Sequence, residues 1–170
     1  GSVVDTDNED TDNAIFITHL RYEYQQRWLP GNPSEYVSSA GISIHYTPQT
    51  LPSSERNVMT GPYGVRAYEP ALFSADTMYS ITLKQSMRYL RPIDGLGILP
   101  FGFVDYAHGE QNTDVGSTGA FLGAGLGLDI LYKSSVNGRL TIGMPLAESL
   151  TEELSEQPTG PIVYSYVNFI

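Results

Sequence analysis

The segment Gly119-Ala120-Phe121-Leu122-Gly123-Ala124-Gly125-Leu126-Gly127-Leu128-Asp129-Ile130 decides the fold of this chain. Every second residue in it is apolar, and the residues between them are mostly glycine. A period of two places the apolar side chains on one face of a β-strand and the small residues on the other. We therefore predict a strand over residues 118–132, with one apolar face and one face of small residues.

The same alternation recurs in six further segments of the chain. They are residues 14–28, 39–46, 79–89, 98–106, 140–146 and 162–170. Leu20, Tyr22 and Tyr24, for example, alternate with Arg21 and Glu23. The pattern in residues 140–146 predicts a shorter strand than the others. These segments predict an all-β protein with about seven or eight strands.

The composition of the 170 residues excludes several classes of function. The formal net charge is −10 and only 9 Lys and Arg occur, so the clustered positive charge that binds nucleic acid is missing. The chain contains no cysteine and can form neither a disulfide nor a thiolate metal site. The sequence contains no run of about 18 apolar residues, so it predicts no transmembrane helix.

No motif in the sequence predicts catalysis or cofactor binding. His19, His45 and His108 are scattered without the spacing of metal ligands. The glycines of residues 123–127 lack the strand-turn-helix context of a nucleotide-binding loop, and no Gly-x-Ser-x-Gly elbow occurs. We therefore expect no enzyme activity, no metal and no cofactor.

Strand length and connection length favour an antiparallel transmembrane β-barrel over a soluble sandwich. Several segments exceed the usual length of about 5–6 residues for a globular strand, and Tyr and Trp stand toward their ends, as in the aromatic girdles of membrane barrels. Long and short connections also alternate, as they do between the two sides of such barrels. The long ones are predicted at residues 51–77, 107–117 and 147–161, and the short ones at 30–36, 91–97 and 133–138.

The longest connection, residues 51–77, carries three motifs in a fixed order. Leu51-Pro52-Ser53-Ser54-Glu55-Arg56 is followed by Gly61-Pro62-Tyr63-Gly64-Val65-Arg66-Ala67-Tyr68 and then by Ser74-Ala75-Asp76. This order resembles the haemolysin activation and secretion proteins, which are the outer-membrane transporters of two-partner secretion. The resemblance implies that residues 14–170 are the C-terminal strands of a larger transmembrane barrel, preceded by an acidic lead-in at residues 1–13.

In that family the long loop folds back into the barrel lumen, where its Val-Arg-Gly-Tyr tip touches a Phe-Xaa-Asp motif on the wall. The resemblance therefore implies a lumen-directed loop at residues 51–77 and a contact formed by Val65, Arg66, Ala67, Tyr68, Phe103 and Asp105. Alternation independently places Phe103 and Asp105 on one face of their strand. A guanidinium in a partly desolvated lumen needs a carboxylate, so we expect an ion pair between Arg66 and Asp105.

Two positions depart from the family pattern. The chain has Ala67 and Ala75 where the family usually has glycine. If the backbone at such a position has a positive φ, an alanine there is strained by roughly 1–2 kcal/mol. The departures therefore predict a contact between the loop and the wall that is either weaker than in the family or differently shaped.

The resemblance also implies a function, the transport of a haemolysin-type or adhesin-type partner polypeptide across the bacterial outer membrane. The expected partners are that polypeptide, outer-membrane lipid and the barrel-assembly machinery, which would recognise the terminal strand with Tyr164, Tyr166 and Phe169. The alternative is a small structural or adhesive outer-membrane barrel with no transport role. Because barrels of this kind close with an even number of strands, seven strands predict either a further strand before Ala14 or self-association of a fragment.

Overall fold

The computed structural model describes residues 17–31, 35–87, 90–113, 116–133, 135–151 and 160–169. Several segments of the sequence predictions lie outside these ranges. They are the acidic lead-in at residues 1–13 with any strand before Ala14, the end of the third predicted strand at residues 88–89, the acidic residues 152–159, and Ile170.

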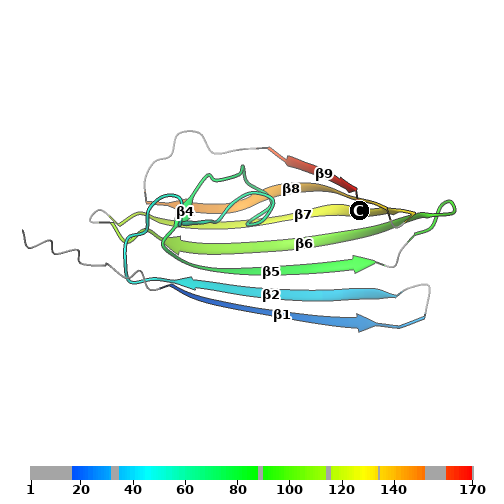
Figure 1. The fold of residues 1–170 in the computed structure, drawn as a ribbon, viewed down its shortest axis with the longest axis horizontal. Helices are drawn as coiled ribbons and strands as arrows, with labels where there is room; N and C mark the ends of the chain where they lie inside the picture. Colours follow the sequence, from blue (N-terminus) through cyan, green and yellow to red (C-terminus); the bar gives the residue numbers. More distant parts are fainter. Residues whose placement is uncertain are drawn as a thin grey trace, which may run out of the picture.

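The described chain is an antiparallel sheet of seven strands, which confirms the predicted all-β class (Figure 1). The sheet order is β1-β2-β5-β6-β7-β8-β9. Its strands are β1 (Thr18–Trp28), β2 (Tyr36–Tyr46), β5 (Thr77–Met87), β6 (Leu96–Glu110), β7 (Thr118–Tyr132), β8 (Val136–Leu150) and β9 (Ile162–Phe169). The long connection between β2 and β5 contains a separate two-stranded ladder, β3 (Asn57–Val58) with β4 (Ser74–Ala75). No helix among the described residues is long and apolar enough to cross a bilayer.

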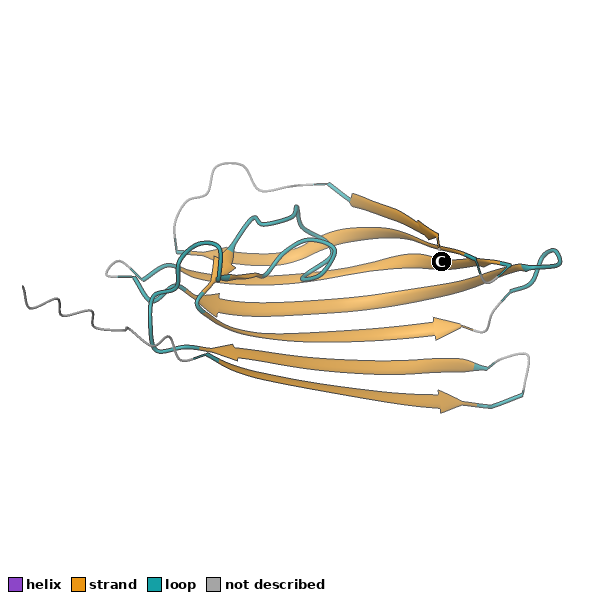
Figure 2. Cartoon of the chain, in the orientation of Figure 1, coloured by secondary structure: helices purple, strands orange, loops and turns teal. Residues whose placement is uncertain are grey.

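The predicted alternation sorts the side chains onto two faces of this sheet. Residues 47–76 lie over one face, which we call the loop face (Figure 2). The opposite face is called the apolar face, and on it Leu83 stands beside Val104 and Val104 beside Ala124. Its exposed apolar side chains include Leu20, Tyr22, Ile42, Ile44, Tyr79, Ile81, Leu83, Val104, Leu126, Ile142, Met144, Val163 and Val167.

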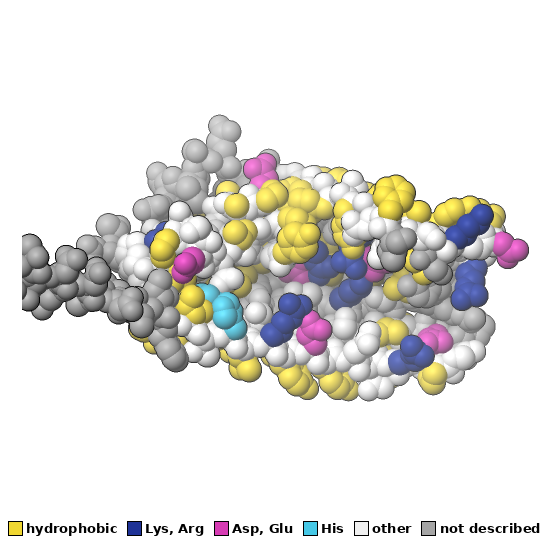
Figure 3. All heavy atoms as spheres, in the orientation of Figure 1, with side chains coloured by type: hydrophobic (Ala, Val, Ile, Leu, Met, Phe, Trp, Pro, Cys, Tyr) yellow, Lys and Arg dark blue, Asp and Glu magenta, His cyan; other side chains and the backbone are white. Residues whose placement is uncertain are grey.

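The loop face carries the other half of each alternation. Asp105 of β6 lies between Thr82 of β5 and Gly123 of β7, so polar and small residues face the loop there. Basic side chains gather in the hollow beside the loop, with acidic side chains among them (Figure 3). The core of the molecule forms where the loop packs on β6 and β7, and its buried members are Met59, Val65, Ala67, Tyr68, Phe73, Ala75, Ala107 and Phe121.

Three predicted strands, β2, β6 and β8, are longer in the structure than in the sequence prediction, and β2 begins at Tyr36 rather than at residue 39. β8 was predicted to be a short strand at residues 140–146, but it spans Val136–Leu150 and is as long as β7. The alternation in β8 reverses after Leu146, where the register of β7 and β8 shifts between Leu122 and Gly123. β6 likewise extends to Glu110, so the connection after it shrinks to residues 111–117 and is no longer than residues 29–35. The predicted contrast of long and short connections therefore rests on residues 47–76 and 151–161.

The two outer strands of the sheet each have one neighbour. Among the described residues β1 pairs only with β2, and β9 pairs only with β8. The described strands therefore form an open sheet rather than a closed ring. Closure into a membrane barrel and pairing of the free edges with another copy both stay predictions.

Candidate functional site

The tip of the loop between β2 and β5 is a tight turn built around two glycines. The N–H of Gly61 donates to the carbonyl of Val65 at 3.2 Å, and the N–H of Val65 donates to the carbonyl of Met59 at 2.9 Å. Gly61 has a φ of +105°, a conformation that L side chains rarely adopt. A Cβ on Gly64 would lie 2.2 Å from the Met59 carbonyl oxygen. The turn therefore depends on glycine, and it directs the next residues toward the sheet.

Arg66 follows this turn and forms a bidentate ion pair with Asp105. Its Nε donates to Asp105 Oδ2 at 2.7 Å, and its Nη2 donates to Oδ1 at 2.8 Å. The backbone N–H of Arg66 also donates to Oδ2, at 3.2 Å. Arg66 is 9% exposed and Asp105 is 1% exposed. The contact expected from the sequence is present, and it fixes both the side chain and the main chain of the loop tip to β6.

β6 presents an aromatic ring beside the carboxylate. The Arg66 Cζ atom lies 3.8 Å from the centre of the Phe103 ring, close enough for a cation–π interaction. Phe103 shares the loop face with Asp105 because strand residues two apart point the same way. One strand therefore supplies both contacts to the guanidinium. Removing Asp105 would leave a buried unpaired charge, which costs about 3–5 kcal/mol in buried pairs.

Ala67 is fully buried and fits into a space left by two glycines of the sheet. A Cβ added to Gly123 would lie 2.3 Å from the Cβ of Ala67, and one added to Gly143 would lie 2.7 Å from its Cα. Both distances are far inside the usual contact of about 3.5–4.0 Å between carbon atoms. β7 and β8 therefore need glycine at these positions for the loop tip to dock.

The strain expected from alanine at two family glycine positions is not found. Among the described residues, the non-glycine residues with a positive φ are Leu29, Ala71 and Lys133. Ala67 and Ala75 are both fully buried and do not have that conformation. The conditional penalty predicted for them therefore does not apply.

Tyr68 inserts beside the register shift between β7 and β8. Its hydroxyl lies 3.0 Å from the carbonyl oxygen of Leu122 and 2.7 Å from that of Ala147, within reach of both acceptors. These carbonyls flank the shift, where Leu122 faces Ala147 but Gly123 faces Pro145. Burial is the main cause that raises the pKa of Tyr68 to about 12, so the hydroxyl stays protonated at neutral pH and can donate. The ring also packs edge-on against Phe121, with 5.1 Å between the ring centres.

A second anchor holds the base of the same loop. Asp76 is fully buried, and its Oδ1 accepts from the N–H of Leu51 at 2.9 Å and from Nε of Arg56 at 3.0 Å. Its Oδ2 accepts from the N–H of Asn112 at 2.7 Å. The first and third motifs of the loop thus meet at one carboxylate. The sequence singled out these motifs but did not predict that Asp76 joins them.

A third charged cluster on the loop face was not predicted from the sequence. Nζ of Lys84 donates to Oδ2 of Asp129 at 3.0 Å, and Arg139 contacts both oxygens of the same carboxylate. The Lys84 nitrogen lies 4.1 Å from the centre of the Phe101 ring. Part of the signal was available, because Lys84 and Asp129 stand on the polar faces of their predicted strands, but only the sheet order brings them and Arg139 together.

The three aromatic residues singled out in the terminal strand have different surroundings. The Tyr164 hydroxyl donates to the backbone carbonyl of Tyr68, so β9 touches the loop tip. Tyr166 lies on the same face, with its ring centre 5.9 Å from the Arg139 guanidinium. Phe169 is exposed. Only Tyr164 therefore belongs to the site around Arg66.

The chain was compared with protein-family models, with curated proteins and with solved structures, and none of them matches it. The similarity to two-partner secretion transporters therefore rests on the three loop motifs and on Phe103-Val104-Asp105.

Proposed function

We propose that this chain is a segment of an outer-membrane β-barrel transporter that moves a partner polypeptide across the bacterial outer membrane. The observation that carries the proposal is the buried, bidentate ion pair between Arg66 and Asp105. It holds a long loop against the polar side of a sheet, where a transport pore would run. The three loop motifs that resemble two-partner secretion transporters lie at this pair and at the Asp76 anchor.

The exposed side of the sheet supports a membrane location. Soluble monomers rarely expose a contiguous apolar patch larger than a few hundred Å². Here exposed apolar side chains occur on every strand of the sheet. Aromatic pairs stand at both of its ends, with Trp28 stacked on Tyr36 and Tyr79 near Tyr106. An apolar band between aromatic girdles is the pattern that outer-membrane strands present to lipid.

The loop has the properties of a plug that rests on the pore wall. The guanidinium of Arg66 is attached to the sheet by one carboxylate, whereas the base of the loop is attached through Asp76. Loss of the tip contact would free the tip while the base stays fixed. We therefore expect the state of the Arg66–Asp105 pair to control how far the loop obstructs the pore.

Reconstitution into planar lipid bilayers tests this proposal. The complete barrel that contains this segment should insert and conduct ions, and in it Arg66→Ala should conduct more or open more often because the loop tip is released. Arg21→Ala is the matched control, since Arg21 forms an exposed ion pair with Glu23 on the same face of the sheet. It should keep the loop docked and change conductance less than Arg66→Ala does.

Two outcomes would count against transport. A protein that stays in the aqueous phase has no membrane role, and one that inserts without conductance supports the structural or adhesive alternative. In cells that carry the gene, an Arg66→Ala or Asp105→Ala variant that assembles and still secretes the partner polypeptide normally would remove the role of the pair.

A further inference from the structure

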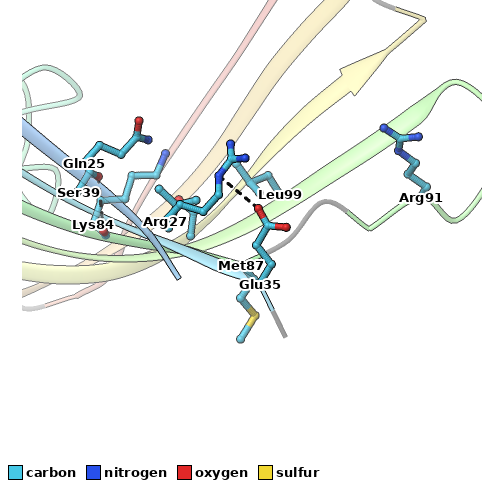
Figure 4. A pocket seen from close by; sticks show the side chains of 10 residues that line it. Gln25, Arg27, Glu35, Ser39, Lys84, Met87, Arg91 and Leu99 are labelled. Atoms are coloured by element: carbon cyan, nitrogen blue, oxygen red, sulfur yellow. Dashed lines mark hydrogen bonds and ion pairs between the residues drawn. The ribbon is translucent and has the colours of Figure 1, made fainter. Parts of the chain in front are cut away.

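Two cavities lie on the loop face, beside the docked loop. The larger, of about 710 Å³, lies between the loop and strands β1, β2 and β5, and the exposed Tyr63 is part of its wall. The smaller, of about 640 Å³, lies toward the end of the sheet where Trp28 pairs with Tyr36, and its wall includes Arg27, Glu35, Val37, Arg91 and Leu99 (Figure 4). We call the smaller one the basic cavity. Gln25, Ser39 and Lys84 line both cavities, so the two spaces adjoin around these side chains.

The basic cavity holds more positive than negative charge. Arg27, Lys84 and Arg91 face it, against the single carboxylate of Glu35, whose Oε1 lies 3.3 Å from Nε of Arg27. Lys84 must share Asp129 with Arg139, so this cluster also carries one positive charge in excess. Among the described residues no carboxylate pairs with Arg91. The surplus is notable because the chain as a whole has a net charge of −10.

We propose that the basic cavity binds acidic segments of the translocated polypeptide through their carboxylates. The physiological ligand in this inference rests on the proposed transport function, but the binding itself can be measured without transport. Arg27 and Arg91 supply guanidinium groups that match a carboxylate in geometry, and Lys84 supplies a point charge at the passage into the larger cavity.

A polypeptide fits these cavities better than a lipid headgroup does. The basic cavity lies on the loop face, opposite the apolar face that would contact lipid. An extended chain bound there can continue past Lys84 into the larger cavity. The wall of that cavity on β2 and β5 is made mainly of small and polar residues such as Ser43, Ser80 and Thr82, with Ile42 and Met78 among them. An exposed tyrosine ring, Tyr63, stands on the opposite wall. The adjoining cavities therefore form a continuous surface of polar and apolar side chains for a peptide chain.

Fluorescence anisotropy on the refolded chain in zwitterionic detergent tests the inference. The probes are labelled ten-residue peptides of glutamate, glutamine and lysine. We expect the glutamate peptide to bind most tightly, although the overall charge of the protein repels it. Its affinity should fall as salt is raised, since ions screen exposed charges. Equal or tighter binding of the lysine peptide would overturn the proposal, because the net charge alone explains that order.

Three variants locate the binding. Arg91→Gln breaks no ion pair and should weaken the glutamate peptide about threefold to fivefold, and Arg27→Gln should do so by a similar factor. Lys133→Gln is the matched control, because Lys133 is a cation at the same end of the sheet that lines neither cavity. Equal weakening by all three variants would overturn the site. The fluorescence of Trp28, the single tryptophan of the sequence, confirms that each variant is folded.

The two proposals fail in different ways. If the protein binds the glutamate peptide selectively but neither conducts nor secretes, the transport function is wrong and the binding site remains. If it conducts and responds to Arg66→Ala but does not distinguish the peptides, the acidic binding site is wrong and the transport function remains.

Discussion

The loop face has two halves that differ in how closely the loop covers them. Over β7 and β8 the tip packs directly on the sheet, and Ala67, Tyr68 and Phe121 are fully buried. Over β1 and β2 the strands remain open, and the side chains of the ion pair between Arg21 and Glu23 are 77% and 65% exposed. One half of the face is thus a protein interior, and the other half is the wall of a cavity.

Glycine has opposite roles in the two halves. Gly123 of β7 has no room for a methyl group because Ala67 occupies that space. A methyl group on Gly41 of β2 would meet no atom within 4 Å. Ion pairs differ in the same way, because burial makes the loss of a partner costly whereas exposed pairs contribute little. Each pair of positions therefore provides a variant and its own control.

Asp105→Ala should lower the free energy of unfolding more than any other variant, and far more than its control on the open half. It leaves the buried Arg66 guanidinium unpaired, and we expect the free energy of unfolding to fall by about 3–5 kcal/mol, less if water enters beside the undocked loop. Denaturant unfolding of the refolded protein measures this change, and limited proteolysis should show faster cleavage within residues 47–76.

Glu23→Ala is the control for that variant on the open half. It removes one partner of an exposed ion pair of the same chemical kind. We expect no measurable change in unfolding or in loop cleavage, because such pairs contribute little. If Glu23→Ala lowers the free energy of unfolding as much as Asp105→Ala does, the two ion pairs do not differ in burial and the structure is contradicted.

The next largest difference in stability should be between Gly123→Ala on the packed half and Gly41→Ala on the open half. The new methyl group at residue 123 would lie 2.3 Å from the Cβ of Ala67, so the loop tip must move away from β7. Overpacking of this kind costs about 1–3 kcal/mol. Gly41→Ala should be neutral or slightly stabilising, since glycine weakens a strand. The thermal unfolding midpoints of the two variants test this prediction. If Gly41→Ala lowers the midpoint as much as Gly123→Ala does, the prediction is wrong.

Much of this contrast could be predicted from the sequence, but not all of it. The period of two placed Phe103 and Asp105 on one face, and the loop motifs indicated their partner, Arg66. Alternation also placed the glycines of β7 on the polar face. Nothing in the spacing revealed that Ala67 would fill the space above Gly123 and Gly143, because that contact joins segments far apart in the chain.

Two kinds of feature could not be predicted from the sequence. Some lie where the alternation along a strand is interrupted, and others are contacts between side chains of different strands. The C-terminal end of β8 was missed because the alternation reverses after Leu146, at the register shift between Leu122 and Gly123. The partners of Tyr68 were missed for the same reason, since they are backbone carbonyls at that shift. Lys84 and Asp129 lie on β5 and β7, and their pairing across β6 follows from the sheet order rather than from either strand.

Tyr68→Phe should have a smaller effect than Gly123→Ala and should act only on the packed half. The ring and its contact with Phe121 remain, but the hydroxyl that can reach two carbonyls is lost. A net hydrogen bond contributes about 0.5–1.5 kcal/mol, so we expect a loss near 1 kcal/mol in denaturant unfolding. Tyr22→Phe, on the exposed apolar face, is the control and should change nothing. A neutral Tyr68→Phe variant would mean that the carbonyls at the register shift need no donor.

The same hydroxyl predicts a specific alkaline response. The pKa of Tyr68 is raised from 10.0 to about 12. The unfolded chain therefore loses this proton at a lower pH than the folded chain does, and stability falls as pH rises from 10 toward 12. Below pH 10 the contribution is fully present. The difference in unfolding free energy between wild type and Tyr68→Phe should accordingly shrink over this range, and a constant difference would rule out the buried hydroxyl as its cause.

Tyr164→Phe should have the smallest effect, and it tests whether the packed half reaches the edge of the sheet. The Tyr164 hydroxyl is the contact of β9 with the loop tip, through the carbonyl of Tyr68. β9 otherwise depends on β8, so loss of this bond should speed amide hydrogen exchange in residues 162–169 with little change in global stability. Tyr166→Phe is the matched control on the same strand and face. If both variants exchange like wild type, pairing with β8 alone holds β9, and the loop tip stabilises β7 and β8 but not the free edge.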